Sequence, residues 1–272
     1  MVSIARRPLA LVAALLAALA LACGGDSAAD STADGSLRGR ITVFAAASLT
    51  EAFEEIATRF EALHPAAEVV FNFAGSPTLR LQLELGARAD VFASADQAQL
   101  ARAQASGSVR ADDAVFASNT LVVILPAANP AAIEALADLK RDGLKLVIAD
   151  EAVPAGAYTR ELLAALAADP AFGAGFADAV LANVVSLESN VKQVVAKVEL
   201  GEADAGIVYR SDVTPAVAPR LARIELPAAL NVRAEYAVAL TRDAANAAVA
   251  RAFVDFLLSP AAQAVMRQHG FS

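Results

Sequence analysis

The sequence predicts an α/β fold of two units, each built on a mainly parallel sheet flanked by helices. Short apolar runs alternate with segments of helical period along the chain from residue 41 onward. Such alternation is typical of parallel strands, because a helix must return the chain from one strand to the next. With 272 residues, of which 57% are hydrophobic, the chain can fill two cores of about a hundred residues each.

The composition excludes several other classes of protein. A hydrophobic content of 57% is too high for an intrinsically disordered chain. The net charge of −8 and the lack of a Lys/Arg cluster in the sequence argue against nucleic acid as a partner. A single cysteine provides neither a disulfide framework nor a cysteine-based metal cluster.

The first half of the alternation lies between residues 41 and 105. Leu49, Phe53, Ile56 and Phe60 recur at the spacing of a helix that buries one face. The β-branched and aromatic run before this helix predicts a strand. In order, we predict strands at 41–46, 68–73 and 90–94, and helices at 49–63, 77–85 and 97–105.

The second half begins with the apolar run TLVVIL at 120–125, which predicts a long buried strand. The last predicted helix carries Phe253, Phe256 and Leu257 on one face. No internal repeat is visible in the sequence. Further strands are predicted at 145–149, 205–208, 223–226 and 235–240, and further helices at 158–168, 191–200 and 243–267.

The N-terminal segment is typical of an export signal. Two arginines at 6–7 precede an apolar run over 8–22, which is short for a transmembrane helix and normal for a signal peptide. The small residues before Cys23 resemble the lipobox of bacterial lipoproteins, although Ala20 stands where Leu is common. We therefore predict a signal peptide over 1–22 and a lipidated Cys23. The alternative is a simple signal peptide with an incidental thiol.

Either form of the N-terminus predicts export to the periplasm or cell envelope. Residues 23–40 are rich in Gly, Ser, Ala and Asp and lack apolar periodicity, so they predict a flexible tether behind the lipidated cysteine. The lipid anchor is then the one expected contact with the membrane.

Several predicted helices begin with residues that are suited to binding an anion. A helix start offers unpaired N–H groups and the positive end of the helix dipole. If the strands are parallel, these helix starts meet at the carboxyl edge of the sheet, where ligands bind in open α/β folds. Taken singly, each pattern is explained as well by an ordinary helix cap. The predicted helix starts in question are four: the capping-box pattern from Ser48 to Glu51, and the pairs Ser76-Pro77, Val153-Pro154 and Ser189-Asn190.

Six short strings together are more specific than any one of these patterns. They are ITVFAAASLTE (41–51), FAGSPTL (73–79), ADVFASADQ (89–97), VPAGAY (153–158), GIVYRSD (206–212) and the closing Gly270-Phe271. In order and spacing they resemble the periplasmic molybdate-binding proteins of ABC transporters. The resemblance covers nearly all of the chain from Ile41 to Phe271.

The resemblance implies a two-lobed type II periplasmic-binding-protein fold. Lobe 1 would comprise 41–119 and 236–272, lobe 2 would comprise 120–235, and the strands at 120–125 and 235–240 would be the two crossovers. The function implied is capture of molybdate, and also tungstate, by a monomer that delivers the oxyanion to an ABC permease in the inner membrane. No cofactor and no enzymatic activity are implied.

The resemblance also implies the ligand-binding residues: Ser48, Ser76, Ala155, Val191 and Tyr209. At these positions the family holds the oxyanion through hydroxyl and backbone N–H groups, so molybdenum has no direct protein ligand. Neutral donors suit a divalent anion that carries no proton. Hydrogenphosphate would need an acceptor, and none of these positions is Asp or Glu.

Three alternatives stay open at this stage. The first is a binding protein for sulfate or another small anion, since sulfate has the same charge. The second is a hydrolytic enzyme, but the sequence around Ser76 is not G-x-S-x-G, and His64 and His269 are poorly placed for catalysis. The third is a purely structural lipoprotein, which would leave the converging donors without a role.

Overall fold

The computed structural model describes residues 37–272, which fall within one compact unit, Ser36–Ser272. The predicted signal peptide over 1–22 and the predicted lipidation of Cys23 lie outside the described residues. The tether predicted over 23–40 is too long at its C-terminal end, because the first strand, β1 (Gly39–Ala46), already includes residues 39 and 40.

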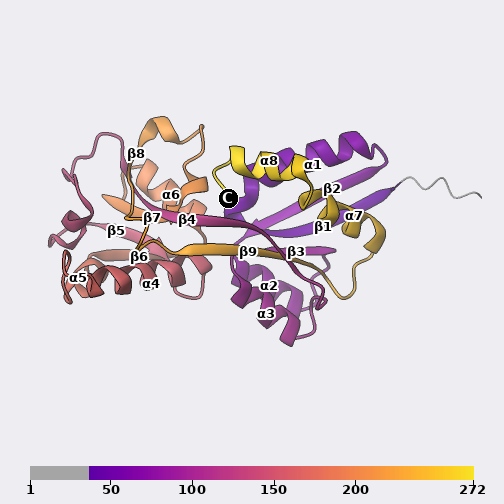
Figure 1. The fold of residues 1–272 in the computed structure, drawn as a ribbon, viewed down its shortest axis with the longest axis horizontal. Coiled ribbons are helices and arrows are strands. Elements are labelled where there is room, and N and C mark those ends of the chain that lie inside the picture. The colour runs from indigo at the N-terminus through magenta and orange to yellow at the C-terminus, as the bar shows by residue number, and fades with distance from the viewer. Residues whose placement is uncertain (1–36) are drawn as a thin grey trace, which may run out of the picture. The chain divides into compact units, whose positions relative to one another are not determined.

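The first lobe is built on four strands in the order β2-β1-β3-β9 (Figure 1). β1 runs parallel to β2 (Ala67–Ala74) and β3 (Val91–Ser94), whereas β9 (Arg233–Leu240) is antiparallel to β3. Five helices cover the sheet, with α2 and α3 on one face and the other three on the opposite face (Figure 1). They are α1 (Thr50–Leu63), α2 (Ser76–Glu84), α3 (Gln97–Ala105), α7 (Ala247–Leu257) and α8 (Pro260–Gln268).

Side-chain alternation along β1 explains why helices cover both faces of this sheet. Ile41 and Val43 join the core cluster that includes α1, α7 and α8, while Phe44 joins a second cluster with residues of α2 and α3. Successive side chains of a strand point to opposite faces, so a strand that is apolar at both kinds of position needs cover on both sides.

The second lobe is built on β5 (Leu146–Ala149), β6 (Val184–Glu188), β7 (Ala205–Tyr209) and β8 (Leu221–Ile224). β5 is parallel to β7, as predicted for strands joined through helices, and to β6, which was not predicted from the sequence. The helices of this lobe are α4 (Pro154–Ala168), α5 (Phe176–Ala182) and α6 (Val191–Glu199). Short 3-10 helices complete the described chain: η1 (Ala47–Leu49), η2 (Leu136–Lys140), η3 (Arg210–Asp212) and η4 (Ala218–Arg220).

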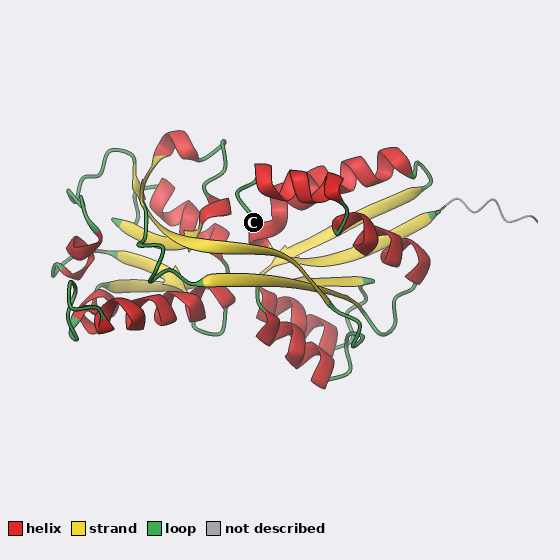
Figure 2. Cartoon of the chain, viewed as in Figure 1, coloured by secondary structure: helices red, strands yellow, loops and turns green. Residues whose placement is uncertain are grey.

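One long strand, β4 (Ala114–Pro126), belongs to both lobes (Figure 2). Its first part pairs with β9 from Ala114 to Thr120, and its second part pairs antiparallel with β7 and β8 from Leu121 onward. The predicted strand at 120–125 is therefore only the second half of β4. β4 and β9 together make the two crossovers of a two-lobed α/β fold, and each adds antiparallel pairing to the parallel strands of its sheet.

The single helix predicted at 243–267 is wrong in one respect, because the structure has two helices there. α7 ends at Leu257 and α8 begins at Pro260, with a bend of 63° between them. A proline interrupts helical hydrogen bonding, and the Ser259 hydroxyl accepts the Ala262 N–H at 3.4 Å and caps the new helix. No single helix among the described residues has the length and apolarity to span a membrane, and only the bent pair α7 and α8 passes such a test, on length and composition alone.

Gly156 provides a test of how closely α4 packs against the end of β5. A Cβ at this position would lie 1.9 Å from the Asp150 carbonyl oxygen and 2.4 Å from that of Ala149. We expect Gly156→Ala to lower the free energy of unfolding by about 1–3 kcal/mol, measured by urea denaturation. Gly175→Ala is the control, because its Cβ would meet nothing within 4 Å, and it should cost less than about 1 kcal/mol. Equal stability of the two variants would contradict this packing.

Candidate functional site

A cavity lies between the lobes at the carboxyl ends of the parallel strands. Its walls come from the carboxyl ends of β1, β2 and β7 and from the turns that follow β1, β2, β3, β5 and β6. All five predicted ligand-binding residues line it, and no charged side chain does. The lining residues are Ala46, Ala47, Ser48, Ala74, Gly75, Ser76, Ala95, Val153, Pro154, Ala155, Asn190, Val191 and Tyr209.

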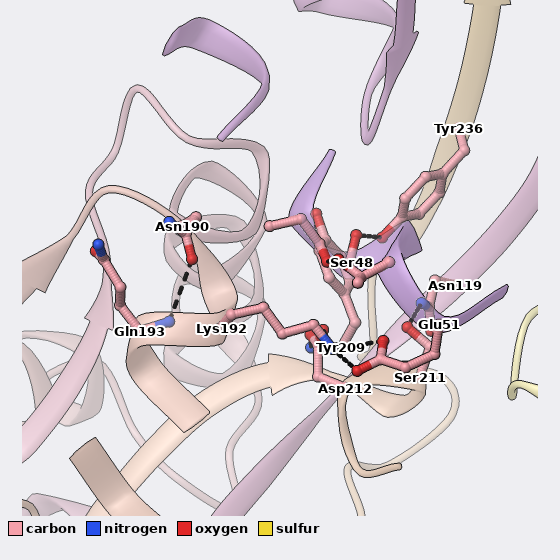
Figure 3. A network of polar contacts seen from close by, with 12 residues as sticks. Ser48, Glu51, Asn119, Asn190, Lys192, Gln193, Tyr209, Ser211, Asp212 and Tyr236 are labelled. Atoms are coloured by element: carbon pink, nitrogen blue, oxygen red, sulfur yellow. Dashed lines mark hydrogen bonds and ion pairs between the residues drawn. The ribbon is translucent and has the colours of Figure 1, made fainter. Parts of the chain in front are cut away.

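Ser48 lies in η1, immediately after β1, and is buried. Its Oγ lies 2.9 Å from the hydroxyl of Tyr236 on β9 (Figure 3). The predicted capping box is wrong: α1 begins at Thr50 with Leu49 as its N-cap residue and has no side-chain cap. The inserted turn of 3-10 helix moves Ser48 off the end of α1. When the Tyr236 hydroxyl donates to Ser48, the serine O–H is free to donate into the cavity.

Ser76 lies in the first turn of α2 and is buried. The structure makes Gly75 the N-cap residue, so the prediction that Ser76 caps this helix is wrong by one position. The Ser76 Oγ instead accepts the backbone N–H of Ala95 at 3.1 Å. Because that bond uses the oxygen as an acceptor, the hydroxyl proton remains available to a ligand.

Ala155 and Val191 bring backbone N–H groups from the second lobe. Ala155 follows Pro154 in the first turn of α4, and Val191 is the first residue of α6. N–H groups in the first turn have no acceptor within their own helix. Neither of these two has an acceptor elsewhere among the described residues. Asn190 caps α6 by accepting the N–H of Gln193 at 3.2 Å, which leaves Val191 open to the cavity.

Tyr209 ends β7 and is almost completely buried. Its hydroxyl has no hydrogen-bond partner in the part of the chain that the structure describes. Burial, with the nearby Tyr236 as a smaller contribution, raises the pKa of this hydroxyl well above its usual value. The group therefore remains an O–H donor at physiological pH. An unpaired buried donor costs free energy unless a ligand accepts from it.

A second layer of residues behind the cavity was not predicted from the sequence. Asp212 accepts the backbone N–H of Tyr209 at 3.0 Å and fixes the turn that follows β7. Asn119 of β4 donates to the hydroxyl of Ser211 at 2.8 Å (Figure 3). Burial raises the pKa of Asp212 to about 7, and Lys192 partly opposes this shift. Asp212 falls inside the string GIVYRSD, but nothing in the sequence marks Asn119 or Tyr236, because they come from the crossover strands.

The described lobes are closed against each other around the cavity. Its volume is about 10 Å³, about enough for one water molecule. A Cβ on Gly75 of the first lobe would lie 2.2 Å from the carbonyl oxygen of Ser189 in the second. A tetrahedral oxyanion has five heavy atoms, so its entry requires these two walls to separate.

Other candidate chemistry lies away from the cavity. His269 is 2.9 Å from the Glu55 carboxylate, and the His64 ring contacts that of Phe60 at a centroid distance of 4.8 Å. Neither histidine lines the cavity. The described residues contain no group of three or more His, Cys, Asp or Glu side chains arranged to hold a metal ion.

The chain is similar in sequence to known binding proteins. Residues 41–272 match the family described as "Bacterial extracellular solute-binding protein". The molybdate-binding protein ModA of Mycobacterium tuberculosis (strain ATCC 25618 / H37Rv) is 40% identical over 232 residues, which cover 85% of this chain and 84% of that protein. ModA of Escherichia coli (strain K12) is 37% identical over 244 residues, covering 86% and 89%.

A solved structure has the same fold. The periplasmic molybdate-binding protein of Azotobacter vinelandii superposes with a TM-score of 0.73 over 85% of this chain and 98% of that one. At 22% identity this similarity is evidence for the fold only. It confirms the predicted two-lobed periplasmic-binding-protein fold. By its sequence match over residues 41–272, the chain belongs to the bacterial extracellular solute-binding proteins, a family of binding proteins and not of enzymes.

Proposed function

We propose that this chain is an extracytoplasmic binding protein that captures molybdate or tungstate and delivers it to an ABC importer. The proposal rests on one observation: Ser48, Ser76, Ala155, Val191 and Tyr209, which come from both lobes, line a single cavity without a charged side chain. The M. tuberculosis relative that is 40% identical carries the name of a molybdate-binding protein.

The donor set suits a doubly charged oxyanion that carries no proton. Two serine hydroxyls, one tyrosine hydroxyl and the N–H groups of Ala155 and Val191 would donate, with the positive ends of α4 and α6 adding to the field. In a closed cleft such dipoles act strongly, because little water competes with them. Hydrogenphosphate would bring a proton that needs an acceptor, and no lining side chain is a carboxylate.

Binding would be coupled to closure of the lobes. We assign 41–119 and 236–272 to lobe 1 and 120–235 to lobe 2, with β4 and β9 as the crossovers. Lobe 1 would capture the anion through Ser48 and Ser76. Lobe 2 would then bring Ala155, Val191 and Tyr209 onto it, a hinge closure driven by contacts that exist only in the closed state.

The cellular setting completes the proposal. The string LALACGG at 19–25 supports a lipidated Cys23 behind a cleaved signal peptide, which would hold a monomer at the outer surface of the inner membrane. There the closed form would meet its permease. Mass spectrometry of the mature N-terminus separates an acylated Cys23 from a simple cleavage nearby.

A panel of oxyanions in calorimetry tests the ligand class. Molybdate and tungstate should each bind one to one with a sub-micromolar dissociation constant and without turnover, because the donors match an unprotonated dianion. Phosphate at pH 8 should give no binding heat. A clear response to sulfate, with none to molybdate or tungstate, would assign the chain to the alternative ligand.

Ser48→Ala tests the first-lobe donors. Loss of a charge-assisted hydrogen bond to a buried oxyanion should weaken molybdate binding by about 1–3 kcal/mol. Tyr209→Phe should have a similar effect from the second lobe. Ser106→Ala is the control, because the Ser106 hydroxyl bonds to the Ala103 carbonyl and to Ser108, away from the cavity. Binding of molybdate by Ser48→Ala with the parent's affinity would remove Ser48 from the site.

A further inference from the structure

One ion pair joins the two lobes beside the cavity. The Lys192 ammonium lies 2.7 Å from both carboxylate oxygens of Glu51 (Figure 3). Glu51 is in the first turn of α1, three residues after Ser48, and Lys192 follows Val191 in the first turn of α6. The pair therefore connects the two segments that bring first-lobe and second-lobe donors to the cavity.

The partial burial of this ion pair strengthens its contribution to the stability of the closed lobes. The side chains of Lys192 and Glu51 are 28% and 38% exposed, so water screens the pair less than it screens ion pairs on an open surface. A Lys side chain is long and flexible, so the contact can form before closure is complete and persist as the walls move slightly apart.

A second carboxylate lies on the other side of the same ammonium. Asp212 of η3 is fully buried, and its Oδ1 is 4.0 Å from the Lys192 Nζ and has no hydrogen-bond partner among the described residues. Asp212 and Lys192 both belong to the second lobe, whereas Glu51 belongs to the first. If the lobes part as rigid bodies, Glu51 would move away with α1, while Asp212 would stay within reach of Lys192.

We propose that Lys192 is a closure-dependent positioning residue, which pairs with Glu51 when the lobes are closed and with Asp212 when they are open. The pair with Glu51 then sets how long the closed lobes retain the oxyanion, and Asp212 lowers the cost of breaking it by offering the ammonium a new partner. This inference rests on the proposed function for its ligand.

For Glu51→Gln, the long-range field and the proposed ion pair predict opposite changes in anion binding. Glu51 is a negative charge close to an anion site, so its removal should tighten anion binding if only the long-range field matters. If Glu51 holds the lobes together, Glu51→Gln should instead speed release of the anion. The direction of the change therefore separates the two explanations.

The dissociation rate of molybdate is measured by stopped-flow mixing of the molybdate complex with excess tungstate. Tyrosine fluorescence follows the exchange, because the chain has three Tyr and no Trp. We expect Glu51→Gln and Lys192→Met each to raise the dissociation rate about five- to tenfold, and the double variant to be no faster than either. Asp212→Asn keeps an acceptor for the Tyr209 N–H and should slow release. Glu55→Gln, one turn further along α1, should match the parent because its partners, Arg59 and His269, are in its own lobe.

Unchanged or slower release from Glu51→Gln would overturn the proposal, as would rates that multiply in the double variant. Faster release from Asp212→Asn would overturn the exchange of partners. Small-angle scattering of the ligand-free full chain tests closure without any ligand: Glu51→Gln should have the larger radius of gyration, and an identical value would contradict the inference. If the unsubstituted protein bound no oxyanion, the proposed function would be refuted. The scattering comparison would still test whether the Lys192–Glu51 ion pair holds the lobes closed.

Discussion

In the proposed function, burial of an anion by neutral donors is the constraint on which the rest of this structure depends. Without a cation in the cavity, the charge must be met by several N–H and O–H groups at once, and one helix start supplies too few. The donors are therefore drawn from the ends of five strands, either the last residue of the strand or the turn after it, and are divided between two lobes. Because neither lobe has a complete set, the anion meets all of its donors only when the lobes are closed.

The fold satisfies this constraint through its connectivity. Parallel strands within each lobe bring helix starts to one edge, and the crossovers β4 and β9 turn the two edges toward each other. The crossovers also support the site directly: Tyr236 of β9 contacts the Ser48 hydroxyl, and its ring lies 5.6 Å from that of Tyr209. The net charge of −8 would oppose the approach of an anion slightly, but no charged side chain lines the cavity, so local dipoles decide the binding.

Much of the fold was predictable because the strands and helices of the core have clear periods, and α3 was placed at the bounds that the structure has. β6 was missed because it is short and half exposed, with Val185 and Leu187 facing out. The five cavity residues were found by resemblance to a family, whereas local patterns misassigned Ser48 and Ser76 as caps. Helix-cap patterns involve only residues that are close in sequence. The hydroxyls of Ser48 and Ser76 form hydrogen bonds with Tyr236 and Ala95, which are far away in sequence.

Anomalous diffraction from crystals grown with tungstate would locate the oxyanion without reference to the protein. We expect one strong peak between Ser48, Ser76, Ala155, Val191 and Tyr209, with no Lys or Arg nitrogen within hydrogen-bond distance of the anion. A peak elsewhere, or an anion held by a Lys or Arg side chain, would contradict the proposed site.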